Sequence, residues 1–258
     1  MAESVPAPHP HPTTTAEFAA NLAAVRANIT AAAQRAGRAP AEVRLLPVSK
    51  TVPEDRLRLA IEAGCHRLGE NKVQEAKRKS ENLAELGVEW AVIGHLQTNK
   101  AKDVAAFAAE FQALDNLRVA EALDRRLTDL GRTLEVFVQV NTSAEESKFG
   151  LPPEELAGFL RELPRFETLK VQGLMTLALF TSEADRVREC FRTLRTLRDR
   201  ARADSPELIG PGELSMGMSG DYELAIEEGA TCVRVGQAIF GARNTPDSQY
   251  WPPTRPQN

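Results

Sequence analysis

The chain has 258 residues, a formal net charge of −4 and an apolar fraction of 42%, which is ordinary for a globular protein. The acidic balance argues against a nucleic-acid-binding protein, because such proteins neutralise phosphates with lysine and arginine. No stretch approaches the roughly 20 consecutive apolar residues of a membrane helix, so a protein anchored in this way is excluded.

The first predicted helix follows a segment, residues 1–15, that is rich in Pro, His and Thr. This segment lacks the positive and apolar regions of a signal peptide, so we expect a disordered leader. Thr14 and Glu17 have the spacing of a capping box and predict the start of the helix, and Gly37 lies past its end. Its apolar face is expected to consist of Phe18, Leu22, Val25 and Ile29.

Eight short apolar runs predict strands, and helical patterns alternate with them. The predicted strands are 43–49, 66–70, 88–94, 111–115, 134–140, 170–175, 213–217 and 232–236. The predicted helices between them are 54–63, 72–86, 98–108, 117–130, 153–162, 183–203 and 220–229. This alternation is typical of an α/β protein with a parallel sheet, and eight strands match a single (β/α)8 TIM-type barrel with an extra N-terminal helix. A doubly wound open sheet is the alternative, but no glycine-rich nucleotide-binding turn follows the first strand.

The barrel domain is expected to span residues 16–244, and residues 245–258 read as a Pro-rich C-terminal tail. The helix over 183–203 carries seven arginines, yet its apolar residues recur at helical spacing, which predicts an amphipathic helix with a charged face. The three cysteines are far apart, odd in number and without CxxC spacing. They indicate a reducing cytoplasm rather than a disulfide framework or a zinc site.

Polar residues follow the strands, at the end of the barrel where such enzymes keep their sites. Lys50 ends the first strand. Such a lysine can act as a base or attack a carbonyl to form a Schiff base, and both roles need the neutral amine. The alternative is a rim lysine that pairs with Glu70 or Asp115.

The loops after the seventh and eighth strands are where barrels commonly bind phosphate. Ser219 precedes a predicted helix, while Gly236 lets the backbone approach an anion and Gln237 adds a further amide. Ser219 could instead be a simple helix N-cap. A phosphate site on one side and a lysine on the other are typical of a pyridoxal 5′-phosphate (PLP) site.

Six segments carry a family resemblance across residues 45–243. They are "LLPVSKTVP", "GENKVQEAKRK", "WAVIGHLQTNKAK", "VFVQVNTSAEESKFG", "VQGLMTL" and "LSMGMSGDYELAIEEGATCVRVGQAIFGAR". They resemble the pyridoxal phosphate homeostasis proteins, whose barrel is similar to the N-terminal domain of alanine racemase.

The resemblance implies a set of cofactor-binding residues. PLP would be held as an aldimine on Lys50, with its phosphate at Ser219 and the Gly236–Gln237 backbone. Arg234 would face the pyridine nitrogen. Relatives often carry a small hydroxyl residue in place of Gln237, so only the backbone contact is carried over there. Pocket-lining positions fall on Asn71, His95 and Met175.

Arg234 favours a carrier over a catalyst, because a guanidinium cannot protonate the pyridine nitrogen as a carboxylic acid would. Racemases of the related fold also use an opposing tyrosine assisted by a second domain. This chain has only Tyr222 and Tyr250, and the segment after the eighth strand is too short for such a domain. No catalytic residues and no metal site are therefore predicted.

The leading hypothesis is a monomeric cytoplasmic protein that buffers or delivers PLP, binding PLP-dependent apoenzymes transiently, without substrate turnover. The alternatives are a small PLP-dependent amino-acid racemase that uses another base, such as His95, and an interaction scaffold without cofactor. Lys148 is a candidate secondary attachment site. It is also explained as a surface lysine that Glu145 and Glu146 keep protonated.

Overall fold

The strands form one all-parallel sheet that closes on itself. The computed structural model describes residues 10–143, 145 and 149–242. The strands are β1 (Arg44–Pro47), β2 (Arg67–Glu70), β3 (Glu89–Val92), β4 (Ala108–Leu114), β5 (Leu134–Gln139), β6 (Leu169–Met175), β7 (Glu213–Ser215) and β8 (Cys232–Val235). Their order is β1-β8-β7-β6-β5-β4-β3-β2, and a parallel bridge between Val48 and Gly69 joins β1 to β2. The predicted (β/α)8 barrel is therefore confirmed.

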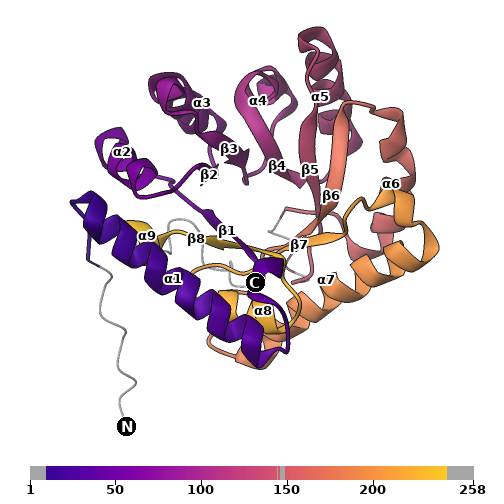
Figure 1. Ribbon diagram of the computed structural model, residues 1–258. Coiled ribbons are helices and arrows are strands. Elements are labelled where there is room, and N and C mark those ends of the chain that lie inside the picture. Colours follow the sequence, from indigo (N-terminus) through magenta and orange to yellow (C-terminus); the bar gives the residue numbers. More distant parts are fainter. Residues whose placement is uncertain (1–9, 144, 146–148, 243–258) are drawn as a thin grey trace, which may run out of the picture.

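Helices alternate with the strands and surround them (Figure 1). They are α1 (Thr15–Arg35), α2 (Glu54–Glu62), α3 (Val73–Asn82), α4 (Ala101–Phe107), α5 (Leu117–Leu130), α6 (Leu156–Glu162), α7 (Ala184–Asp204), α8 (Tyr222–Glu227) and α9 (Gln237–Phe240). Short 3-10 turns are η1 (Pro40–Glu42), η2 (Ala84–Leu86), η3 (Thr98–Lys100), η4 (Pro153–Glu155), η5 (Leu163–Arg165) and η6 (Pro206–Leu208). Among the described helices, none has both the length and the apolar character needed to cross a bilayer.

The extra helix α1 lies against α8 and α9, outside the barrel. The predicted capping box is present, because the Glu17 amide donates to Thr14 Oγ1 at 3.3 Å and the Thr14 amide donates to Glu17 Oε2 at 3.1 Å. The four residues predicted for its inner face are all buried, and Phe18 meets Phe240 edge-on with ring centroids 5.9 Å apart. The N-terminal helix thus covers the last two helices of the barrel.

Strand β4 begins three residues earlier than predicted, at Ala108 instead of residue 111. Residues 108–110, Ala-Ala-Glu, have a low preference for strands, so the sequence does not predict a strand there. The structure supplies a tertiary reason: the buried Glu110 carboxylate lies 2.7 Å from Arg44 and 3.2 Å from Arg67. These ion pairs fill the N-terminal end of the barrel and hold β4 in the sheet.

The arginine-rich helix α7 is amphipathic, as predicted, and buries Val187, Cys190, Phe191 and Leu194. Several of its arginines bind the carboxylates at the end of α8. Glu228 lies 3.0 Å from both Arg188 and Arg192. These arginines therefore fasten one helix to the next, and the charge run needs no external anion to explain it.

Candidate cofactor site at the mouth of the barrel

A cavity of about 440 Å³ opens where β1 and β8 end. Lys50 follows β1, and Gly236 and Gln237 follow β8. The two strands are paired, and the Val48 amide donates to the Val235 carbonyl at 2.9 Å. Because the carboxyl ends of parallel neighbours meet at one edge, the three predicted residues line the same cavity.

Ser219 and Gly236 contact each other directly, since the Gly236 amide donates to Ser219 Oγ at 3.2 Å. The N-cap of α8 is Asp221, so the Ser219 hydroxyl is not a simple helix cap. A β-carbon at Gly236 would stand 3.1 Å from the Val48 carbonyl oxygen, which is tighter than ordinary packing. The absence of a side chain there lets β8 approach the end of β1.

Arg234 points into the barrel and is 2% exposed. Its Nη1 donates to Ser215 Oγ at 2.7 Å, and its Nη2 donates to the Thr176 carbonyl at 2.8 Å. Burial lowers the pKa of this guanidinium from its ordinary value. Both hydrogen-bond partners are neutral, so the buried cation has no directly bonded carboxylate among the described residues.

Met175 ends β6 and is 1% exposed, and the next residue, Thr176, is the one that accepts from Arg234. The Thr176 hydroxyl in turn donates to the Val140 carbonyl at 2.8 Å. The ends of β5, β6 and β8 are thereby linked beneath the mouth.

Asn71 and His95 follow β2 and β3, on another part of the rim. The backbones come so close that a β-carbon on Gly94 would lie 2.1 Å from the Asn71 carbonyl oxygen. His95 is exposed, stacks on Phe149 with ring centroids 3.9 Å apart, and has its Nδ1 3.7 Å from Asp115 Oδ2. Neither residue lines the 440 Å³ cavity, and Met175, Ser219 and Arg234 do not line it either, so Lys50, Gly236 and Gln237 are the predicted residues that do.

Three residues that line the cavity escaped sequence analysis: His11 and Thr13 near the N-terminus, and Arg56 in α2. The Arg56 guanidinium donates to the Phe240 carbonyl at 2.7 Å and to the Pro12 carbonyl at 3.2 Å. Arg56 therefore joins the end of the predicted leader, at Pro12, to the end of α9, at Phe240. No periodic pattern in residues 10–13 could have predicted this contact. Lys148 and Tyr250 lie outside the described residues.

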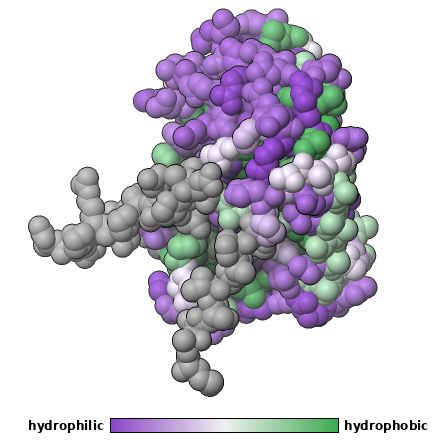
Figure 2. Space-filling view, turned by 90° about the vertical axis from the view of Figure 1, so that its left-hand side faces the viewer, coloured by the Kyte–Doolittle hydropathy of each residue, from purple (hydrophilic) through white to green (hydrophobic). Residues whose placement is uncertain are grey.

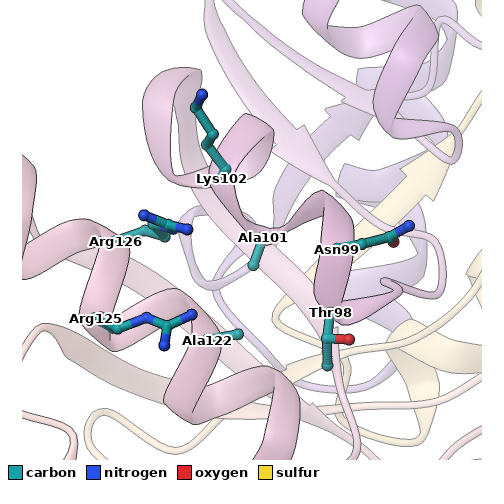
Figure 3. Close-up of a pocket in the computed structure, with 7 residues that line it drawn as sticks. All are labelled: Thr98, Asn99, Ala101, Lys102, Ala122, Arg125 and Arg126. Carbon is teal, nitrogen blue, oxygen red and sulfur yellow. The ribbon is translucent and has the colours of Figure 1, made fainter.

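A second cavity, of about 290 Å³, lies between η3, α4 and α5 and shares no lining residue with the first (Figure 3). It is lined by Lys102, Arg125 and Arg126 together with Thr98 and Asn99. In Figure 3 the Lys102 ammonium extends away from the two guanidinium groups, so the cations do not converge on one point.

The family model that describes the N-terminal domain of alanine racemase matches residues 20–244. The pyridoxal phosphate homeostasis protein of Escherichia coli K12 is 43% identical over 235 residues, which cover 88% of this chain and 97% of that protein. The chain belongs to this family. The predicted resemblance is confirmed.

Solved structures agree with this family assignment. PipY of Synechococcus elongatus, solved with PLP bound, has a TM-score of 0.76 and 34% identity, covering 87% of this chain and all of that one. An alanine racemase of Clostridium difficile has a TM-score of 0.68 at 14% identity and shares the fold alone. This chain covers 60% of that racemase.

Tyr222 does not face the mouth of this homeostasis-family barrel. It lies on α8, is 6% exposed, and its hydroxyl accepts a hydrogen bond from Asn28 Nδ2 of α1 at 3.1 Å. The side chain thus packs between two outer helices, where it cannot act on a molecule bound beside Lys50.

Proposed function

We propose that the chain binds PLP at the barrel mouth through Lys50 and buffers or delivers it. One observation carries the proposal: the lysine that ends β1 shares a cavity with the Gly236–Gln237 turn that follows β8. A homeostasis protein that is 43% identical and a 34% identical relative solved with PLP bound support the choice of ligand.

The residues present fit the three chemical groups of PLP. The Lys50 amine suits the aldehyde: its nitrogen attacks the aldehyde carbon, a C=N bond forms and water leaves, which gives a Schiff base. The Ser219 hydroxyl and the backbone of the Gly236–Gln237 turn suit the phosphate. The turn can approach an anion closely because Gly236 has no side chain.

Arg234 suits the pyridine nitrogen, which can accept a hydrogen bond but receives no proton from a guanidinium. Burial lowers the pKa of Arg234, yet an arginine retains its proton in proteins. When bound, PLP supplies an electron sink only to the extent that its ring nitrogen is protonated. Arg234 therefore favours storage of the cofactor over carbanion chemistry.

We further propose that the chain turns over no amino acid. The buried position of Tyr222 supports this, because the tyrosine is engaged by Asn28 on the outer face of the barrel. Chiral analysis of alanine and other amino acids incubated with the PLP-loaded protein tests the racemase alternative. Appearance of the opposite enantiomer at ordinary enzyme rates, dependent on Lys50, would overturn the carrier assignment.

A monomer in a reducing cytoplasm that meets PLP-dependent apoenzymes transiently remains our proposal for the setting. Three buried free thiols, at Cys65, Cys190 and Cys232, support the reducing compartment. Asn71, His95 and Met175 are proposed as further pocket residues, and Lys148 as a secondary attachment site. The division into leader (1–15), barrel (16–244) and tail (245–258) also stays a prediction.

The decisive experiment combines visible absorbance with peptide mapping. The parent protein, Lys50→Ala and Lys72→Ala are mixed with PLP, reduced with borohydride and digested. Lys72 is an exposed lysine at the start of α3 and serves as the matched control. We expect a Schiff-base band and a pyridoxyl-modified Lys50 peptide in the parent and in Lys72→Ala only. A band that persists in Lys50→Ala moves the attachment to another lysine, and no band in the parent refutes the proposal.

A further inference from the structure

Lys79 is a completely buried lysine on the inner face of α3. Its ammonium donates to the Ser49 carbonyl at 2.9 Å, to Glu70 Oε1 at 2.7 Å and to Glu75 Oε1 at 2.7 Å. An ammonium has three protons, and all three are engaged here. A buried charge is tolerated only with such partners, so these three acceptors form a specific site for the Lys79 ammonium.

The acceptors of Lys79 lead to both chain neighbours of Lys50. On the side that precedes Lys50, the Ser49 hydroxyl donates to Glu70 Oε1 at 2.6 Å, while its carbonyl accepts from Lys79. On the side that follows, the Thr51 amide donates to Glu75 Oε1 at 2.8 Å. Lys79 is thus joined directly to one neighbour of Lys50 and through a single carboxylate to the other.

The turn that carries Lys50 has an unfavourable backbone conformation. Thr51 has φ = 65°, and no other non-glycine residue within the described ranges has a positive φ. A β-branched residue rarely adopts this region, so other contacts must hold it there. The Val52 amide closes the turn onto the Ser49 carbonyl at 3.0 Å. Lys79 donates to that same carbonyl.

The pKa values of the two carboxyl groups that contact Lys79 are shifted in opposite directions. Burial raises the pKa of Glu70 and outweighs the lowering effect of Lys79. For Glu75, burial also acts to raise the pKa, but the hydrogen bond and charge of Lys79, together with the Thr51 amide and Arg78, prevail and lower it. Glu70 Oε2 is buried without a hydrogen-bond partner. Loss of the Lys79 ammonium would therefore leave the buried Glu70 carboxyl group and the partly buried Glu75 carboxyl group without their shared cation.

We propose that Lys79 is a positioning residue for Lys50: it holds the strained Ser49–Lys50–Thr51 turn so that the Lys50 amine stands in the cavity beside Gly236. The inference rests on the proposed function, because it concerns the reactivity of Lys50 toward an aldehyde. It assigns Lys79 no contact with the ligand. The competing explanation is that Lys79 only joins α3 to the barrel, which would affect stability but leave the chemistry of Lys50 unchanged.

The test compares Lys79→Met with Lys77→Met in the full chain. Lys77 lies on the same helix but is partly exposed and pairs with Asp103 at 2.9 Å. One readout, hydrogen–deuterium exchange of the peptide that contains Thr51, is made without any ligand. The other is the rate of covalent attachment of PLP to Lys50 in protein shown to be folded by circular dichroism.

We expect Lys79→Met to speed exchange at Thr51 and to slow attachment by about tenfold or more, since a displaced nucleophile reacts far more slowly. Lys77→Met should stay within about twofold of the parent in both readouts. Adding Thr51→Gly to Lys79→Met should recover part of the attachment rate, because glycine adopts a positive φ without strain.

The inference is overturned if folded Lys79→Met attaches PLP at the parental rate, even when exchange at Thr51 is faster. If Lys79→Met does not fold, Glu75→Gln tests the same link to Thr51. An unchanged rate of PLP attachment in that variant would also overturn the inference. A parent protein that never attaches PLP to Lys50 would refute the proposed function instead, and the exchange readout would still report whether Lys79 holds the turn.

Discussion

Inside the barrel, Arg234 Nη1 donates to Ser215 Oγ at 2.7 Å, and the same hydroxyl donates to Gln112 Oε1 at 2.7 Å. Gln112 Nε2 continues the chain to Glu110 Oε1 at 2.5 Å, and Glu110 is paired with Arg44. A line of buried hydrogen bonds therefore runs from the ion pairs at the N-terminal end of the barrel to the guanidinium beneath the mouth. It fixes the orientation of Arg234 without placing a carboxylate directly against it.

Replacing Ser215 with alanine should destabilise the fold, because the change leaves Arg234 Nη1 and Gln112 Oε1 without the buried hydroxyl that each of them contacts. We expect the free energy of unfolding to fall by about 1–3 kcal/mol, the usual cost of an unsatisfied buried polar group. Urea denaturation measures it. Ser80→Ala is the control, since the half-buried Ser80 hydroxyl bonds only a carbonyl of its own helix, and its effect should stay within about 0.5 kcal/mol. If both variants lose the same free energy of unfolding, the Ser215 hydroxyl does not stabilise the fold through its buried hydrogen bonds.

Much of the barrel could be predicted from the sequence because its signals are local. Alternating apolar runs and helical patterns identified every strand, and the parallel topology then brought Lys50, Gly236 and Gln237 to one edge. The loops after β7 and β8 were also read correctly as neighbours, since Ser219 and Gly236 are hydrogen-bonded.

The buried role of Lys79 could not be predicted in the same way. The segment "KVQEAKRKS" reads as a charged helix, although Lys79 falls three residues after the buried Ala76 and six after Val73, on the inner face. A lysine on that face is acceptable only because Ser49 and Glu70, from other elements, supply acceptors. Such non-local partners leave no periodic signal.

Gly94 is predicted to be irreplaceable by alanine, and Gly158 is the matched control. A β-carbon on Gly94 would lie 2.1 Å from the Asn71 carbonyl oxygen, and backbone on both sides must then move. We expect a loss of about 1–3 kcal/mol or more in the free energy of unfolding. Gly158 lies in α6 with nothing within 4 Å of the added carbon, so alanine there should stabilise by about 0.5–1 kcal/mol. Denaturant titration of both variants measures these changes. If Gly94→Ala leaves the free energy of unfolding unchanged, the rim can relax around the added carbon and the prediction is wrong.

The cysteines should be unreactive in the native protein. All three are buried and free, and burial raises the pKa of Cys65 to about 12. The thiolate is the reacting species, so a buried thiol with a raised pKa reacts slowly at neutral pH. We expect Ellman's reagent to detect almost no thiol in the folded chain and three after denaturation in guanidinium chloride. A fast-reacting thiol in the folded protein would contradict this packing.

Much of the surface seen in Figure 2 is hydrophilic, and acidic and basic side chains on the outer helices form ion pairs whose strength depends on pH. Glu227 on α8 accepts from Arg188 of α7 and, at 3.0 Å, from Arg35 of α1. The hydrogen bond from Arg188 is the main cause that lowers the pKa of Glu227 below its ordinary value of 4.5, against the opposing effect of burial.

Glu227 should therefore stabilise the fold in a pH-dependent way. A carboxyl group whose pKa is lower in the folded state contributes stability that is fully present above its unfolded pKa and is lost as pH falls through the folded pKa. We expect Glu227→Gln to reduce the free energy of unfolding at pH 7 by about 1 kcal/mol or less, because solvent screens these partly exposed groups. The difference from the parent should shrink below about pH 4.5 and nearly vanish once the parental carboxyl is protonated. Urea titrations from pH 7 down to the acid limit measure this, with exposed Glu121→Gln as the control. A difference that stays constant or grows as pH falls would show that the Arg188–Glu227 contact does not stabilise the fold through its charge.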